Sequence, residues 1–364
     1  MILKRCNMKS FDNICDGKKL VCYGIGGEFE RIVENYSDYK WIDSIVYLVD
    51  GNDTKRGTEK IVNGIEHTIL SLDEFLKREL SNIIILITCT AFEEVIEKLN
   101  KISQLDKIEC YPFHFMYNLS ENEQIKIRQT DTALIPPIIH YCWFGKGDKS
   151  DLYKKCIDSW HKYCPKYQIK EWNETNCDVS ETVYTKQAYD AGKYGFVSDY
   201  FRLKIIYENG GIYLDTDVEL LRSLDDLRYN EAFCGMQFPG EVASGLGFGA
   251  VKNNKVVYYL MRRYKKMKFI KENGSLNEVP CPIYLTEDLR KIGMKHGPGF
   301  QRIEGLSIYP IEVLSPKNPS TGEYLPTLNS YTIHHYDGSW VDKELQSENV
   351  ERMRKKKRIK DMFS

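Results

Sequence analysis

Hydrophobic and polar positions alternate in blocks along the first third of the chain. Apolar runs at 19–23, 44–49 and 83–88 predict strands, and stretches with apolar residues at helical spacing lie between and after them. Strands that alternate with helices favour parallel βαβ units. The pattern therefore predicts a Rossmann-like α/β domain over residues 1–130.

A glycine-rich turn follows the first of these strands. Its sequence, Gly24-Ile25-Gly26-Gly27-Glu28-Phe29, opens a predicted helix, and Asp50 ends the next strand, a spacing that suits a pyrophosphate and a ribose. The third glycine of the G-x-G-x-x-G motif normally allows close packing of the helix on the strand, but this chain has Phe29 at that position. Two interpretations stay open: a nucleotide-binding sensor built on Gly24–Phe29, or a tight turn in a structural or regulatory domain.

A polar segment separates this region from the next one. Residues 118–132 lack strong apolar periodicity and lead into Pro136-Pro137, where extended backbone is favoured. We predict a second, larger α/β domain over residues 131–342.

The second domain contains a predicted amphipathic helix with a sharp end. Apolar spacing predicts the helix over 196–207, and Gly210-Gly211 suits a left-handed C-cap. Asp199 and Arg202 are three residues apart on this helix. From spacing alone they could form a surface ion pair.

A D-x-D motif follows the two glycines. The sequence predicts one strand over 212–220, in which Asp215 and Asp217 point to the same face. Paired carboxylates repel one another unless they are compensated, and such oxygen-rich sites prefer Mg²⁺ or Mn²⁺. Exposed polar strand positions are the alternative.

A histidine pair near the C-terminus could complete such a metal site. The segment His334-His335-Tyr336-Asp337-Gly338-Ser339-Trp340 offers an imidazole ligand, a hydroxyl near a phosphate, and a flat indole wall. A histidine with a structural role is the alternative unless this loop returns to the D-x-D strand.

Together these motifs give the second domain a specific resemblance. It resembles the bacterial glycosyltransferases of family 32, which are related to fungal α-mannosyltransferases and clostridial toxin glucosyltransferase domains, through I-I-H-Y-C-W-F-G (138–145), S-D-Y-F-R-L (198–203), G-G-I-Y-L-D-T-D-V-E (210–219) and H-H-Y-D-G-S-W (334–340). The resemblance covers about residues 134–342. It implies a GT-A-type fold, a nucleotide-sugar donor, a divalent metal (Mn²⁺ or Mg²⁺) and retention of anomeric configuration.

The same resemblance implies roles for individual residues. Asp217 would bind the metal that bridges the donor diphosphate, Asp215 would contact the ribose and the metal, and His335 would be the C-terminal metal ligand. The implied donor-binding residues are Trp143 on the nucleobase, Ser198, Asp199 and Arg202 on the sugar and its phosphate, and Ser339 and Trp340 over the diphosphate. Asp199, Arg202 and Asp217 are the predicted catalytic residues, and no nucleophile is predicted.

Composition narrows the function classes. The net charge of −1 gives no global field for nucleic acid, and the run Ile83–Ile87 is far shorter than the roughly 20 residues that span a bilayer. The first residues lack the apolar segment of a secretory signal, and 11 cysteines without a C-x-x-C pair favour reduced thiols in a cytoplasmic protein.

The C-terminal segment, residues 343–364, is predicted to be a basic tail. From Glu351 onward it has seven Lys or Arg and two acids, so the rest of the chain carries a net charge of −6. A solvated tail is one interpretation. The other is peripheral contact with an anionic inner membrane, since each basic residue near such a surface contributes about 1 kcal/mol.

The sequence therefore predicts a metal-dependent, retaining glycosyltransferase. It would move a sugar from a nucleotide-sugar, with a UDP-sugar as the expected donor, to a glycan or lipid-linked acceptor in capsular or surface polysaccharide assembly. Two alternatives are a non-catalytic nucleotide sensor and a D-x-D phosphatase, but the phosphatase pattern needs Thr or Val where this chain has Glu219.

Overall fold

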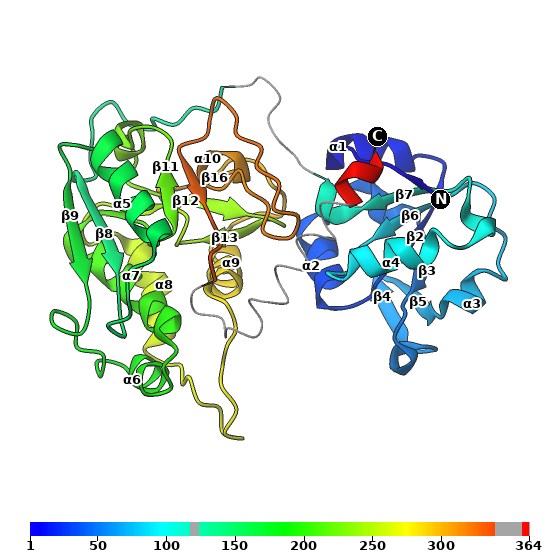
Figure 1. Ribbon diagram of the computed structural model, residues 1–364, viewed down its shortest axis with the longest axis horizontal. Coiled ribbons are helices and arrows are strands. Elements are labelled where there is room, and N and C mark those ends of the chain that lie inside the picture. The colour runs from blue at the N-terminus through cyan, green and yellow to red at the C-terminus, as the bar shows by residue number, and fades with distance from the viewer. Residues whose placement is uncertain (117–123, 339–358, 364) are drawn as a thin grey trace. The chain divides into compact units, whose positions relative to one another are not determined.

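The structure is a computed structural model that describes residues 1–116, 124–338 and 359–363. The chain divides into two compact units (Figure 1). Unit 1 is Met1–Leu119 with Ser320–Gly322 and Glu344–Ser364, and unit 2 is Ser120–Pro319 with Glu323–Lys343. In the described part of the chain, no helix is long and apolar enough to cross a membrane.

Unit 1 is built on one seven-stranded sheet in the order β1-β7-β6-β2-β3-β5-β4. Its pairs are parallel apart from the antiparallel β4–β5 hairpin. The strands are β1 (Ile2–Leu3), β2 (Lys19–Tyr23), β3 (Ile45–Val49), β4 (Glu59–Val62), β5 (Ile65–Leu70), β6 (Ile83–Ile87) and β7 (Glu109–Pro112). The helices are α1 (Met8–Cys15), α2 (Gly27–Asn35), α3 (Leu72–Phe75) and α4 (Phe92–Leu99). The three predicted strands are thus confirmed as β2, β3 and β6, and they pair in parallel.

The last described residues complete the core of unit 1. Ile359 is 2% exposed and belongs to the same buried cluster as the central strands. The Phe363 ring lies 4.8 Å from the Phe115 ring, and the Arg5 guanidinium lies over it at 5.9 Å. Figure 1 shows this C-terminal turn in red beside the blue N-terminal elements. The end of the tail is therefore packed on unit 1, whereas residues 339–358 lie outside the described residues.

Unit 2 contains an eight-stranded mixed sheet and a separate two-stranded sheet. The strands are β8 (Ile138–Cys142), β9 (Gln168–Trp172), β10 (Gly211–Tyr213), β11 (Val218–Leu220), β12 (Ala232–Gln237), β13 (Glu241–Ala243), β14 (Phe248–Ala250), β15 (Gln301–Ile303), β16 (Leu306–Tyr309) and β17 (Thr332–His334). The helices are α5 (Asp151–Tyr163), α6 (Val183–Asp190), α7 (Tyr194–Asn209), α8 (Lys255–Tyr264), α9 (Cys281–Lys291) and α10 (Ile311–Leu314). Both units are α/β, as the sequence predicts.

The large sheet has the order β15-β16-β12-β14-β10-β8-β9, with β13 beside β12. β8 pairs in parallel with β9 and with β10, so these three strands end at the same edge of the sheet. The segment between the two units approaches this unit before the predicted boundary at residue 130. Ile127 is 9% exposed, and its carbonyl accepts a hydrogen bond from the Tyr309 hydroxyl at 2.6 Å.

The predicted helix is confirmed as α7, and it ends as expected. Gly210 caps it with φ of +68°, and its N–H donates to the Ile206 carbonyl. His140, which is fully buried on β8, holds this cap: its Nε2 lies 2.9 Å from the Gly210 carbonyl, while its Nδ1 accepts from the Trp172 indole. The imidazole is therefore the Nε2–H tautomer with a structural role.

The prediction of one continuous strand over residues 212–220 is wrong, because this stretch contains two short strands joined by a turn. β10 ends at Tyr213, residues 214–217 form a turn, and β11 starts at Val218 in the two-stranded sheet, where it pairs antiparallel with β17. The Val218 N–H donates to the Asp215 carbonyl across this turn. The chain leaves one sheet and enters another here, so the D-x-D motif lies on the connection and not on a strand face.

Candidate active site

The turn between β10 and β11 holds both aspartates of the D-x-D motif. The Asp215 N–H donates to the Gly245 carbonyl, and its Oδ1 accepts from the Tyr213 hydroxyl at 3.0 Å. A Cβ atom on Gly245 would lie 2.0 Å from Asp215 Oδ2. The carboxylate of Asp215 therefore occupies the space that the missing side chain of Gly245 leaves.

Asp217 is held by the segment that follows β17. Its Oδ1 lies 3.0 Å from His334 Nε2, its Oδ2 accepts from the Asp337 N–H at 2.9 Å, and its carbonyl accepts from the His335 N–H. The loop with the histidine pair thus returns to the D-x-D turn. Because the loop returns to this turn, a histidine of the pair can serve as a metal ligand.

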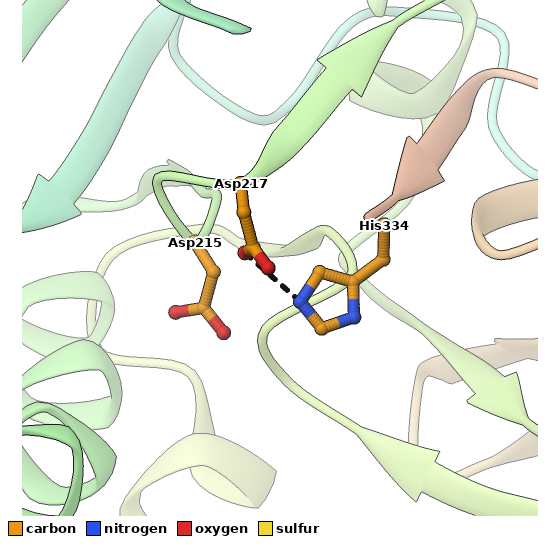
Figure 2. A group of neighbouring side chains, drawn as sticks. All are labelled: Asp215, Asp217 and His334. Atoms are coloured by element: carbon orange, nitrogen blue, oxygen red, sulfur yellow. Dashed lines mark hydrogen bonds and ion pairs between the residues drawn. The ribbon is translucent and has the colours of Figure 1, made fainter. Parts of the chain in front are cut away.

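The structure places His334, and not His335, beside the aspartates. His334 is the last residue of β17 and pairs with Val218, so its ring reaches the start of β11 (Figure 2). The ring of His335 turns to Glu219, with Nε2 to Oε2 at 2.9 Å, and Glu219 also pairs with Lys155 at 2.7 Å. The expectation of His335 as a metal ligand is therefore corrected, because consecutive side chains at a strand end point in different directions.

Asp215, Asp217 and His334 could hold a metal ion together. One ligand atom from each lies within 4.8 Å of those of the other two, and all three residues are half-buried. Two carboxylates and one imidazole are a ligand set that suits Mn²⁺, and the carboxylates suit Mg²⁺. The residues present therefore fit the divalent metal that the sequence predicts.

Arg202 joins the predicted donor-binding residues to this turn. One of its guanidinium nitrogens lies 3.2 Å from Asp199 and 3.1 Å from Asp215. Arg202 and Asp199 are 5% and 8% exposed. They do form an ion pair, but it is buried and does not lie on the surface. The guanidinium also lies over the Tyr213 ring at 5.1 Å and donates to the Ser244 hydroxyl at 3.5 Å. The helix motif that contains Asp199 and the D-x-D motif thus meet through one buried cation, Arg202.

Burial and neighbouring charges shift the pKa values in this cluster. Burial raises the pKa of Asp199 to about 6, an effect that Arg202 opposes and Asp215 reinforces. Burial also acts to raise the pKa of Asp217, but the charge and hydrogen bond of His334 and the Asp337 amide hold it well below its usual range. The carboxylate of Asp217 is therefore ionised at neutral pH and available to a cation.

The other predicted donor-binding residues have different positions. Trp143 follows β8 at the same sheet edge as the D-x-D turn, but its indole donates to the Gly147 carbonyl and packs edge-on against Tyr153 at 5.2 Å. The Ser198 hydroxyl donates to the Tyr194 carbonyl within α7, while the Ser198 carbonyl accepts from Arg202 at 3.3 Å. The predictions for Ser339 and Trp340 lie outside the described residues.

The glycine-rich turn of unit 1 is satisfied by its own chain. The Ile25 N–H donates to the Asp50 carboxylate at 2.6 Å, and Lys55 bonds both this carboxylate and the Ile25 carbonyl. The first turn of α2 carries Glu28 and Glu30, which disfavour a phosphate there. The Ile25 amide would have to bind the pyrophosphate if this turn held a nucleotide, but here it already donates to Asp50.

Comparisons with known proteins agree with the site in unit 2. Residues 150–234 match the family described as a glycosyltransferase sugar-binding region containing a DXD motif. Inositol phosphoceramide mannosyltransferase 3 of Schizosaccharomyces pombe (strain 972 / ATCC 24843) is 26% identical over 151 residues, which are 40% of this chain and 41% of that protein. The chain thus matches about two fifths of the length of this curated relative.

Two solved structures give weaker likenesses. The PaToxG glycosyltransferase matches with a TM-score of 0.34 and 14% identity over 56% of this chain and 78% of that chain. Aspartate semialdehyde dehydrogenase II of Vibrio cholerae matches with a TM-score of 0.21 and 12% identity over 80% of this chain and 68% of that chain. Scores this low carry no argument about fold or function.

The α/β unit with its D-x-D turn defines a candidate sugar-transferase site. The family match falls on the region that contains α5, α7 and this turn, and the mannosyltransferase relative agrees with it. These findings support a glycosyltransferase enzyme with a DXD motif, as the sequence predicts.

Proposed function

We propose that this protein is a metal-dependent, retaining glycosyltransferase of the family 32 type, with a GT-A-type catalytic domain. It moves a sugar from a nucleotide-sugar donor, a UDP-sugar by preference, to an acceptor hydroxyl. The observation that carries the proposal is that His334, from a distant segment, meets Asp215 and Asp217 of the D-x-D turn next to a buried arginine. That combination provides ligands for a hard cation and a positive charge for a phosphate.

The residues of the chain have distinct tasks in this reaction. Asp217 and His334 face each other and would hold the ion with Asp215. When it is bound, a divalent metal neutralises the negative charge that the donor diphosphate gains as the glycosidic bond breaks. Arg202 adds a buried guanidinium whose donors fit phosphate oxygens. Preorganised charges of this kind stabilise the leaving group without further rearrangement.

The second task of Arg202 is to position the donor sugar together with Asp199. Both side chains are buried and in contact, so their geometry is set before the donor arrives. A carboxylate and a guanidinium at fixed separation suit the hydroxyls and the phosphate of a nucleotide-sugar. Retention by a front-face displacement needs no protein nucleophile, and the proposal names none.

The acceptor is proposed to be a glycan or a lipid-linked saccharide in capsular or surface polysaccharide assembly. Support for a lipid-linked acceptor comes from the curated relative, which is named an inositol phosphoceramide mannosyltransferase.

We also propose that the basic tail makes peripheral contact with an anionic inner membrane. Because Ile359 is buried in unit 1, the test is replacement of Lys355–Arg358 by Gln in the full chain, not truncation. Unchanged sedimentation with anionic vesicles would reject the membrane contact.

The experiment for the activity is a donor-hydrolysis screen with UDP- and GDP-sugars, with and without Mn²⁺. Asp217→Asn keeps the shape of the side chain and removes its charge, and we expect turnover to fall at least about a hundredfold. Asp190→Asn is the matched control, since that carboxylate is 55% exposed and pairs with Lys186. An Asp217→Asn protein that keeps most activity at saturating Mn²⁺, or a wild type inactive with every donor, would contradict the proposal.

A further inference from the structure

A lysine on the loop before β17 reaches the segment that holds Asp217. Lys317 follows α10, and its Nζ donates to the His335 carbonyl at 2.6 Å. His335 donates its own N–H to the Asp217 carbonyl. A chain of two hydrogen bonds through His335 therefore joins the Lys317 ammonium to the backbone of Asp217.

The electrostatic surroundings of Lys317 are acidic and partly shielded from water. Burial lowers the pKa of Lys317, while the carboxylates of Asp217 and Asp337 act in the opposite direction. These two carboxylates therefore act on the ammonium electrostatically, beside its hydrogen bond to the His335 carbonyl. A half-buried cation in this position has a desolvation cost that a bound anion would offset.

The carboxylates at the turn already have closer cations. Asp215 pairs with Arg202 at 3.1 Å, and Asp217 pairs with His334 at 3.0 Å. Among the described residues, the hydrogen bond of Lys317 goes to a neutral carbonyl. Since an ammonium has three N–H donors, donors remain for another acceptor.

We propose that Lys317 binds the diphosphate of the nucleotide-sugar donor. The inference rests on the proposed function and adds a residue to it that no sequence motif contains. Arg202 provides a guanidinium from α7, and Lys317 provides a second cation from the loop before β17. As the bond between the anomeric carbon and the phosphate oxygen breaks, its electron pair stays on that oxygen. The acceptor oxygen forms the new bond to the anomeric carbon, and its proton passes to the departing phosphate. Lys317 stabilises the negative charge on that nucleoside diphosphate.

The experiment measures binding of Mn²⁺ alone and of UDP and GDP with Mn²⁺. Lys317→Met keeps most of the aliphatic stem and removes the charge, and Lys317→Arg keeps the charge. We expect Lys317→Met to weaken binding of the nucleoside diphosphate about tenfold or more, with affinity for Mn²⁺ alone unchanged. Lys317→Arg should recover most of the loss.

The matched control is Lys204→Met, because that lysine is 24% exposed and pairs with Glu181 outside the site. It should leave both affinities unchanged, and thermal unfolding should show that every variant is folded. Equal diphosphate affinity in Lys317→Met and wild type would overturn the inference and leave the proposed function intact. If Lys317→Met weakened the binding of Mn²⁺ and of the diphosphate equally, the inference would also be overturned, because Lys317 would then only support the structure of the loop. A wild type that binds neither UDP nor GDP with Mn²⁺ would overturn both proposals.

Discussion

Gly245 provides a sharp test of the position of Asp215. In Gly245→Ala the new Cβ would lie 2.0 Å from Asp215 Oδ2, 2.8 Å from Asp215 Cγ and 3.3 Å from Arg202 Nη1. Ordinary contact begins at 3.4 Å, so the Asp215 oxygen has to move by about 1.4 Å. The obstacle is the end of a flexible side chain, and the carboxylate therefore moves more readily than the backbone.

The expected consequence is a large loss of activity with a small loss of stability. A displacement of about 1 Å in a catalytic arrangement lowers the rate about a hundredfold, whereas overpacking by one methyl group costs about 1–3 kcal/mol. We expect kcat/KM for donor hydrolysis to fall about a hundredfold in Gly245→Ala. The affinity for Mn²⁺ should fall with it, since Asp215 is one of the three candidate ligands.

Gly299→Ala is the matched control, because a Cβ there meets nothing within 4 Å and the backbone has no positive φ. Activity, Mn²⁺ binding and thermal unfolding are measured on both variants and on wild type. The reasoning is refuted if Gly245→Ala is folded and as active as Gly299→Ala. In that case Asp215 would act from a position different from the one next to Gly245.

Two further predictions concern stability. Burial lowers the pKa of His140 to about 4, so unfolding takes up a proton below pH 6.5, and the free energy of unfolding falls as pH falls. His140 should account for about 2 kcal/mol of that loss between pH 7 and pH 5, and urea unfolding of His140→Phe should show a correspondingly smaller pH dependence. Ile359→Ala should lower the free energy of unfolding by about 2–5 kcal/mol because Ile359 is 2% exposed, while Met362→Ala, at 41% exposure, should change it by less than about 0.5 kcal/mol. Equal effects of the two substitutions in thermal or urea unfolding would contradict the packing of the C-terminal turn.

Local patterns in the sequence predicted the elements that depend on local physics. The apolar runs that became β2 and β6 are buried almost throughout, and strands buried on both faces read as continuous apolar segments. The run that became β3 is apolar as well, although Val46 on it is 38% exposed. The end of α7 was predictable because Gly210 takes a backbone conformation that favours glycine.

The parts that failed depend on contacts between distant segments. Alternation cannot reveal that residues 214–217 leave one sheet for another, because the partner of β11 is β17, more than a hundred positions later. The choice between His334 and His335 depends on that same pairing. Gly245 lies in a loop that the sequence could not place, and only the structure brings it against Asp215. Likewise, composition marks the C-terminal segment as basic, but Ile359 is buried in unit 1 and Phe363 packs against the same cluster.

Charge compensation explains why two aspartates can lie on a half-buried turn before any ligand arrives. Each carboxylate has its own cation, since Arg202 pairs with Asp215 and His334 pairs with Asp217. A buried pair contributes little net stability, but loss of one partner leaves a buried charge without compensation. A phosphate would therefore compete with the carboxylates for Arg202, whereas a metal ion would compete with Arg202 for Asp215 and with the His334 proton for Asp217. In the proposed function, binding of the metal and the donor would exchange one set of ionic partners for another, and the protein would not have to create a new charged site.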